Sequence, residues 1–129
     1  MPRIGIAIVE HQGCVLVGVR AAETVLAGMH EFPGGKCLPD ESHSACAVRE
    51  CLEETGLLVE PVEELDHRTF TYPHGEVELG FWRCRLADAA ESTPIPPFAW
   101  IPRSELASLN FPEANRQVIQ QLLNEPEHS

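Results

Sequence analysis

The chain has 129 residues, 43% of them hydrophobic, which is enough for one core and too short for two ordinary domains, so a single domain over residues 1–129 is predicted. Its formal net charge of −11, from 20 acidic and 9 basic residues, disfavours polymeric nucleic acid as a partner, because such a surface needs clustered Lys and Arg. A small phosphorylated ligand would be repelled unless metal ions and a few local cations screened it, so phosphate chemistry here is expected to depend on metal.

Cysteines and apolar runs bear on the cellular compartment. The 5 cysteines form no CxxC pair and their odd number prevents complete pairing, which predicts reduced, mostly buried thiols. The N-terminus lacks the basic start and long apolar core of a signal peptide, and no apolar run approaches the roughly 20 residues that span a bilayer. We therefore expect a cytoplasmic protein with no membrane partner. The 6 histidines show neither HxxxH nor HExxH spacing, so zinc has little support and no histidine is assigned a role.

The N-terminal third predicts two neighbouring strands. Ile4, Ile6 and Ile8 alternate with small or polar residues, a turn signal covers residues 10–13, and residues 14–19 resume with β-branched side chains. Residues 21–31 lack strong periodicity. The run 32–35, which contains Pro-Gly-Gly, predicts a tight loop before the next element.

That next element is predicted to be a helix that ends at Gly56, a suitable left-handed stop, with Asp40 or Ser42 as its N-cap. A rotation of about 100° per residue brings three carboxylates onto one face. The opposite face is apolar and is expected to pack on the core. The acidic residues are Glu50, Glu53 and Glu54, and the apolar ones are Ala45, Val48 and Leu52.

Three carboxylates at this spacing predict a cation site. Like charges at i, i+3 and i+4 repel by a few tenths of a kcal/mol per pair, and a divalent cation would turn that repulsion into binding. Magnesium suits an all-carboxylate site best. Taken alone, however, such a cluster is more often a solvated acidic face with Arg49 as an ordinary ion-pair partner.

The C-terminal half predicts a second antiparallel strand pair and a closing helix. Residues 65–72 and 77–86 are strand-like and are separated by a turn at 73–75, residues 93–97 form a loop, and 99–101 form a short strand. A terminal helix is predicted over 111–125, with Val118, Ile119, Leu122 and Leu123 on its inner side. Strands interrupted by one helix and closed by another favour an α/β sandwich with a mixed sheet.

Residues 35–57 resemble the Nudix box, G-x5-E-x7-R-E-U-x-E-E-x-G-U, where U is a bulky aliphatic residue. The matching residues are Gly35, Glu41, Arg49, Glu50, Glu53, Glu54, Gly56 and Leu57. The one departure is Cys51 at the first U, which as a small buried hydrophobe lightens core packing without touching the acidic face. The chain is therefore identified as a member of the Nudix hydrolase family. The resemblance implies an α/β/α sandwich with a central mixed sheet.

It also implies an enzyme that hydrolyses diphosphate bonds of nucleotides with Mg²⁺, or alternatively Mn²⁺. A catalyst of that reaction must neutralise the phosphate oxygens, orient water in line and deprotonate it. The metal ligands that the resemblance implies are the Gly35 carbonyl, Glu50, Glu53 and Glu54, with Glu50 a ligand or the base. Arg49 is expected to anchor the acids, and Glu41 to orient the loop and helix. The spacing of these residues does not show which of them has which role.

Two flanking segments resemble MutT-type nucleoside triphosphate pyrophosphohydrolases. These are residues 31–36, Glu-Phe-Pro-Gly-Gly-Lys, and residues 110–115, Asn-Phe-Pro-Glu-Ala-Asn. The resemblance implies that Asn115 hydrogen-bonds the edge of an oxidised guanine, that Phe32 lines the base pocket, and that Arg20 and Lys36 bind substrate. An amide supplies a donor and an acceptor together, which suits a purine edge. The plain alternatives are a core role for Phe32, a helix cap for Asn115 and a surface role for Arg20.

The expected function is pyrophosphohydrolysis of a nucleoside triphosphate to monophosphate and pyrophosphate. Oxidised guanine nucleotides such as 8-oxo-dGTP are the favoured substrates, which implies nucleotide-pool sanitation in the service of DNA repair. The alternatives are a pyrimidine pyrophosphohydrolase acting on CTP or a modified dCTP, and a non-catalytic nucleotide-binding module. MutT-type enzymes carry a further acid in the loop before the strand of Trp100, where Glu91 is the nearest candidate. A monomer or a homodimer is expected.

Overall fold

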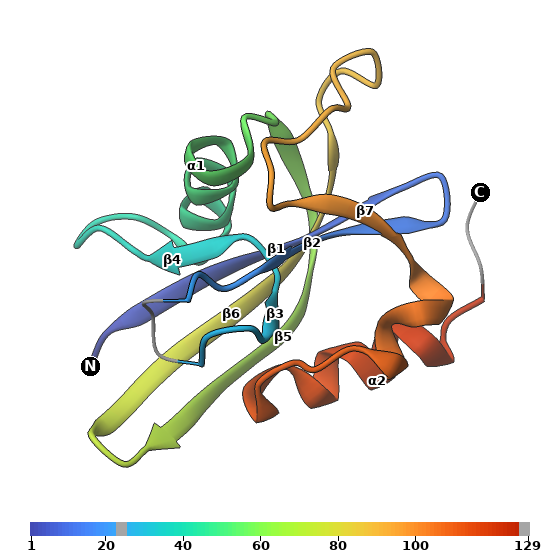
Figure 1. Cartoon of the computed structure of the whole chain (residues 1–129). Helices are drawn as coiled ribbons and strands as arrows, with labels where there is room; N and C mark the ends of the chain where they lie inside the picture. Colours follow the sequence, from blue (N-terminus) through green and yellow to red (C-terminus); the bar gives the residue numbers. More distant parts are fainter. Residues whose placement is uncertain (23–25, 127–129) are drawn as a thin grey trace.

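The computed structural model describes residues 1–22 and 26–126, and it has a sheet with one helical layer on each face (Figure 1). Helix α1 (His43–Thr55) covers one face and α2 (Arg116–Asn124) the other. This arrangement confirms the predicted α/β/α sandwich. Residues 23–25, part of the segment that lacks periodicity, lie outside the described residues.

The sheet is mixed, as predicted. Strands β1 (Arg3–His11) and β2 (Cys14–Val19) form one antiparallel pair, and β5 (Val59–Tyr72) and β6 (Gly75–Leu86) form the other. The two pairs join where β1 runs parallel to β6, in the order β3-β2-β1-β6-β5. The short strand β3 (His30–Glu31) borders β2, and β7 (Ala99–Pro102) also pairs with β2.

The Pro-Gly-Gly segment differs from its prediction. Gly34–Lys36 form a short strand, β4, that pairs with β1 through Gly5 opposite Gly35, so the segment is not simply a tight loop. Only a residue without a side chain fits at Gly34, because a Cβ there would lie 2.5 Å from the main-chain oxygen of Gly5. The glycines therefore serve close backbone approach as well as turning.

Further boundaries differ from the sequence prediction, among them the start of β6 at Gly75 rather than at residue 77. Strand β5 begins at Val59 rather than at residue 65, and register shifts between Pro61 and Glu63 and between Glu64 and Asp66 absorb its irregular start. The terminal helix begins five residues later than predicted at Arg116, after a short 3₁₀ turn at Glu113–Asn115. Pro112 lacks a backbone N–H and holds the chain extended just before that turn. Another 3₁₀ helix covers Arg103–Ser108.

The ends of α1 confirm the predicted caps. The Ser42 hydroxyl accepts a hydrogen bond from the N–H of Ala45, and Gly56 adopts a left-handed conformation with φ of 78°. Its packing face was predicted correctly for Val48, which packs against the core, and wrongly for Ala45 and Leu52, because Ala45 is exposed and Leu52 is 45% exposed. The buried residues of the helix are Cys46, Ala47, Cys51 and Thr55, which confirms the expected burial of Cys51.

Small residues on both partners explain this packing face. A Cβ on Gly5 of β1 would lie 2.7 Å from the Cβ of Cys46, so the helix lies directly on the strand backbone. The cluster on the α1 side of the sheet accordingly contains small side chains such as Ala7, Ala47 and Cys51. Close approach of the helix brings its carboxylates down onto strand β4.

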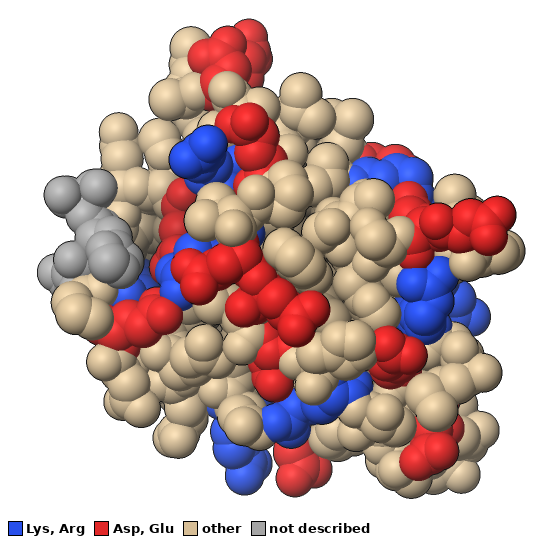
Figure 2. All heavy atoms as spheres, turned by 180° about the vertical axis from the view of Figure 1, so that it is seen from behind, with Lys and Arg blue, Asp and Glu red and all other residues tan. Residues whose placement is uncertain are grey.

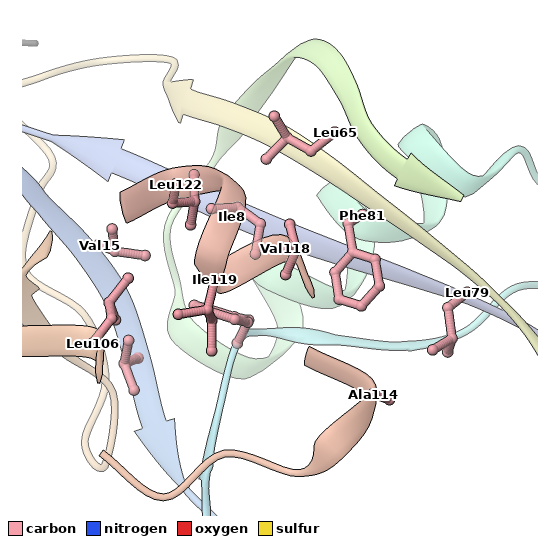
Figure 3. Packing of buried hydrophobic residues seen from close by; sticks show 12 residues of the cluster. Ile8, Val15, Leu65, Leu79, Phe81, Leu106, Ala114, Val118, Ile119 and Leu122 are labelled. Atoms are coloured by element: carbon pink, nitrogen blue, oxygen red, sulfur yellow. The ribbon is translucent and has the colours of Figure 1, made fainter. Parts of the chain in front are cut away.

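The larger core cluster lies on the α2 side of the sheet (Figure 3). Phe81 of β6 and Ile8 of β1 point from the sheet toward Val118 and Leu122 of α2. Trp82, on the opposite face of β6, packs with the cluster on the α1 side. The α2 side therefore supplies most of the bulky apolar packing, which holds the sheet rigid beneath the site described below.

The acidic surface and the thiols agree with the composition. On the face shown in Figure 2, acidic side chains outnumber basic ones. All five cysteines are free thiols, and Cys46, Cys51 and Cys84 are buried. Among the described residues, no helix has the length and apolar character needed to cross a membrane.

Candidate active site

Helix α1 and strand β4 bring the three box carboxylates to one edge of the sheet. A Cβ on Gly35 would lie 1.8 Å from Oε2 of Glu50, so the carboxylate occupies the space that this glycine leaves. Oε1 of Glu54 accepts a hydrogen bond from the N–H of Gly34 at 3.1 Å. Glu53 is turned outward and is 55% exposed. Glu50 and Glu54 thus face the β4 backbone, with Glu53 beside them.

Arg49 holds the acids in place. Its guanidinium donates to both carboxylate oxygens of Glu41, at 2.7 and 2.9 Å. It also donates to Glu53 at 2.7 Å, to Glu50 at 3.3 Å and to the carbonyl of Lys36 at 3.1 Å. A planar guanidinium fixes carboxylate orientation well because its donors form a rigid fork. The structure therefore places Arg49 against the acids and outside the cleft, and its part in catalysis stays a prediction.

Glu41 joins the loop after β4 to the helix. Its carboxylate accepts from Arg49 and from the N–H of Leu38 at 3.0 Å. These two hydrogen bonds, that from Arg49 first, lower the pKa of Glu41 to about 2. Because both favour the charged form, the folded state binds this proton less readily than the unfolded chain does.

We expect Glu41→Gln to lower the free energy of unfolding at pH 7, because it removes an acid whose charged form is stabilised by folding. A lowered pKa contributes stability above the unfolded value, and that contribution is lost as pH falls toward about 2. Urea titrations should therefore show a difference from the wild type that shrinks as the pH drops below roughly 4.3. A difference that stays constant with pH would contradict the charge argument. Glu105→Gln, an exposed acid of the 3₁₀ helix, is the matched control.

The two inner carboxylates are held in an environment that disfavours charge. Partial burial, reinforced by the charges of Glu50 and Glu31 and opposed by the Gly34 N–H, raises the pKa of Glu54 to about 7. Burial is also the largest cause of the raised pKa of Glu50. A cation between two such carboxylates would stabilise their charged forms, because an opposite charge nearby favours ionisation.

The donors fit a hard divalent cation. Glu50, Glu53 and Glu54 offer only oxygen atoms, and hard cations such as Mg²⁺ bind oxygen. The Gly35 carbonyl oxygen, the fourth predicted ligand, accepts a hydrogen bond from the Cys46 thiol at 3.2 Å. A carbonyl oxygen has a second lone pair, so this contact leaves one position for a metal.

A cleft begins at strand β4, whose backbone contacts Glu50 and Glu54, and runs across the α2 side of the sheet. A cavity of about 300 Å³ is lined by Gly34, Gly35 and Lys36 at one end and by Pro112, Ala114 and Asn115 at the other. Ile4, Ile6 and Leu79 form part of its wall. A neighbouring, more apolar hollow of about 600 Å³ shares Tyr72, Val77 and Ala114 with it. The two together run from the box to the segment before α2.

The structure brings the four predicted substrate-binding residues to this cleft. Arg20, Phe32, Lys36 and Asn115 all line it. Phe32 is also a core residue, 6% exposed and stacked on Phe111 with ring centroids 4.7 Å apart, and its contact with a base stays a prediction. Arg20 donates to Glu31 at 3.0 Å. Asn115 precedes α2, but its side chain caps none of the described N–H groups of that helix.

Sequence reasoning missed other cleft residues. Glu31 lines the cleft and accepts a hydrogen bond from Arg20, and its charge contributes to the raised pKa of Glu54. Tyr72 and Val77 reach the cleft from the β5–β6 hairpin. The period-2 alternation of Val77, Leu79 and Phe81 was a signal for one face of a strand, but it did not say that this face borders a ligand cleft. Glu91 is exposed after β6, and its role as a loop acid stays a prediction.

Comparison with known proteins gives concordant results. A family model described as the NUDIX domain matches residues 5–121. An 8-oxo-dGTP diphosphatase of Escherichia coli strain K12 is 29% identical over 125 residues, which cover 93% of this chain and 95% of that protein. A CTP pyrophosphohydrolase of the same strain is 47% identical over 51 residues, 40% of this chain and 38% of that protein. The solution structure of the E. coli ORF135 protein superposes with a TM-score of 0.78 at 26% identity, covering 95% of this chain and 89% of that one.

Proposed function

The chain belongs to the Nudix hydrolase family and is a MutT-like hydrolase of diphosphate bonds, and we propose that it is an Mg²⁺-dependent pyrophosphohydrolase of nucleoside triphosphates, with oxidised guanine nucleotides such as 8-oxo-dGTP preferred. Water adds across the α–β phosphoanhydride, giving a nucleoside monophosphate and pyrophosphate. A role in cleansing the nucleotide pool in support of DNA repair follows from that substrate.

One observation supports this proposal above the others. The cleft joins the β4 segment beneath Glu50 and Glu54 to Asn115, so a ligand along it has one end at the acids and the other at an amide. A nucleotide has this polarity, with phosphates at one end and a hydrogen-bonding base at the other. Lys36 and Arg20 supply the local cations that an acidic protein needs to accept phosphates.

In this proposal, Glu50, Glu53 and Glu54 hold the metal together with the Gly35 carbonyl. The metal supplies Lewis-acid neutralisation of the phosphate oxygens and lowers the pKa of bound water. Arg49 fixes Glu53 and Glu50 in position, and Glu41 fixes Arg49 in turn. Without a cation, burial raises the pKa of Glu54 to about 7, and a bound cation would favour its charged form as a ligand.

At the other end of the cleft, Phe32 and Asn115 divide recognition of the base. The ring of Phe32 is held by its stacking on Phe111 and offers a rigid apolar wall. The Asn115 amide donates and accepts together, as the edge of a purine requires. Its Nδ2 donates to the carbonyl of Pro112 at 3.5 Å, a long contact that a base could replace at little cost.

The decisive assay compares a panel of nucleoside triphosphates in Mg²⁺ and separates pyrophosphate from orthophosphate release. Pyrophosphate as the product and the highest kcat/KM for 8-oxo-dGTP are the expected results. Orthophosphate as the product would contradict the bond assignment, and equal use of dGTP and 8-oxo-dGTP would contradict the base assignment.

Asn115→Ala is expected to lower kcat/KM for the preferred purine by about 10–100-fold, since each lost hydrogen bond to a base costs on the order of 1–2 kcal/mol. Hydrolysis of unpreferred nucleotides should change much less. Steady-state kinetics on two nucleotides measure the ratio directly, and an equal loss on both would show that Asn115 does not read the base. Asn124→Ala at the far end of α2 is the matched control.

A pyrimidine substrate is the second candidate, and the 47% local identity to a CTP pyrophosphohydrolase favours it. The same panel decides, because CTP and modified dCTP would then exceed the guanine nucleotides. A non-catalytic nucleotide-binding module, the third possibility, would bind nucleotide and Mg²⁺ without turnover. The presence of all three box glutamates argues against this last candidate.

A further inference from the structure

Two histidines and a glutamate, distant in sequence, meet on the face of the sheet that α1 covers. His43 is the first residue of α1, His67 lies on β5 and Glu78 on β6. One ligand atom from each lies within 4.8 Å of the others. We propose that His43, His67 and Glu78 form a transition-metal site, with Zn²⁺ as the cation it fits best, separate from the carboxylates of the box.

The strand register builds this site. His67 lies opposite Gly80 in the β5–β6 pair, and Glu78, two residues before Gly80, projects from the same face of its strand. Gly80 leaves the space that the ring of His43 fills, because a Cβ there would lie 2.7 Å from two ring atoms. The glycine therefore admits an imidazole from α1 directly above the two strand residues.

His43 has an unmet requirement that points to a ligand. Its side chain is 12% exposed, and its Nε2 atom is buried without a hydrogen-bond partner among the described residues. The nearest carboxylate oxygen, Oε2 of Glu78, is 3.7 Å away, beyond hydrogen-bond distance. A buried ring nitrogen without a partner is costly, and coordination to a metal would satisfy it.

The interatomic distances are close to those of a coordinated ion. Ligand atoms about 2.0–2.2 Å from a tetrahedral Zn²⁺ lie roughly 3.3 Å from one another. Here Nε2 of His67 is hydrogen-bonded to Oε2 of Glu78 at 2.6 Å, a contact that a bound ion would replace, and Nε2 of His43 is 3.7 Å from that oxygen. Side-chain adjustments on the order of 1 Å suffice. His67, at 42% exposed, leaves a fourth position for water.

A carboxylate beside His67 could orient its ring, as usually happens when a histidine binds a metal. Oε2 of Glu64 lies 3.7 Å from Nδ1 of His67, where a small shift would let it accept the proton of that nitrogen and fix the ring with Nε2 toward the ion. Two imidazoles favour zinc over magnesium, which prefers oxygen. Seven residues of helix, about 10 Å at 1.5 Å per residue, separate His43 from Glu50. The two sites thus differ in place and in metal preference.

The test uses the full chain without an affinity tag, in millimolar Mg²⁺ to occupy the box. Competition between the protein and a chromophoric chelator for Zn²⁺ should reveal one tight site per chain. X-ray absorption should show two imidazole ligands on the bound zinc. We expect His67→Ala and Glu78→Gln each to weaken Zn²⁺ binding by about 100-fold. Both side chains are partly exposed, so folding should survive, and circular dichroism of the metal-free variants checks this.

Three controls separate this site from other places where zinc could bind. His74→Ala removes an exposed histidine of the same hairpin, and Cys37→Ser removes a thiol beside Cys46. Glu53→Gln weakens the box without touching the proposed site. All three variants should bind Zn²⁺ as the wild type does. Loss of binding in Glu53→Gln, sulfur ligands in the absorption spectrum, or unchanged affinity in His67→Ala would each overturn the proposal, whatever the nucleotide assays show.

Discussion

Glu53→Gln is expected to lower turnover of nucleoside triphosphates by roughly 10³-fold, equivalent to about 4 kcal/mol of transition-state stabilisation, while the fold survives. The substitution keeps the shape of the side chain and removes its charge. Glu53 is 55% exposed and packs in no core cluster, so stability depends little on it. Its ion pair with Arg49 is a surface i, i+4 pair, worth only a few tenths of a kcal/mol. The loss should therefore fall on kcat.

Steady-state kinetics with Mg²⁺, together with a thermal melt, measure both halves of this expectation. Glu60→Gln removes the charge of an exposed glutamate on β5 that lies 3.6 Å from Arg85, and it should leave kcat unchanged. Activity retained in Glu53→Gln would show that the metal assignment is wrong. A large fall in melting temperature would instead show that Glu53 has a structural role.

Local signals in the sequence predicted most of the fold. Alternating isoleucines, the turn at residues 73–75, the Ser42 cap and the Gly56 stop each depend on residues within a few positions of one another. Features that depend on distant partners were not predictable in this way. Strand β4 exists because Gly34 and Gly35 pair with β1, some thirty residues earlier in the chain. Nothing local distinguishes such a strand from a loop.

The face of α1 was partly mispredicted for a related reason. Helical spacing placed Ala45, Val48 and Leu52 on the packing side, and of these Val48 packs against the core. The partner surface on β1 contains Gly5 and Ala7 and selects small residues. Cys46 and Ala47 fit that surface and were not predicted to pack, whereas the burial of Cys51 was expected from its place in the box. The strict spacing of the box nevertheless located the acids, because the motif encodes this tertiary packing in its own residues.

The cleft and the His43–His67–Glu78 cluster could not be predicted from the separation of residues along the sequence. The box is one contiguous segment, so its residues could be found by pattern alone. The cluster assembles from α1, β5 and β6 through the β5–β6 register, and none of its separations matches a zinc-binding spacing. Glu31 reached the cleft in the same way, through the pairing of β3 with β2. Sites built by long-range strand pairing become visible only in the folded chain.

Gly35→Ala should reduce kcat by about 10–100-fold with little loss of stability, because the new methyl group would occupy the place of the Glu50 carboxylate. The Cβ would lie 1.8 Å from Oε2 and 2.5 Å from Cδ of Glu50. Both are atoms at the far end of a flexible side chain, which can rotate away without moving the backbone. The neighbouring Gly34→Ala is the contrast, since its Cβ would meet the main-chain oxygen of Gly5 at 2.5 Å. That variant should lose stability.

A double-mutant cycle tests whether displacement of Glu50 is the cause. If Gly35→Ala acts by moving that carboxylate, it should add little to the defect of Glu50→Gln, where the charge is already gone. Full additivity of the two losses in kcat would show that the methyl group acts elsewhere, for example on the Gly35 carbonyl. Urea denaturation of Gly35→Ala and Gly34→Ala completes the comparison, and equal destabilisation of both would contradict a flexible Glu50. The expected pattern, lost activity at residue 35 and lost stability at residue 34, would tie the close fit of β4 under α1 to the placement of one carboxylate.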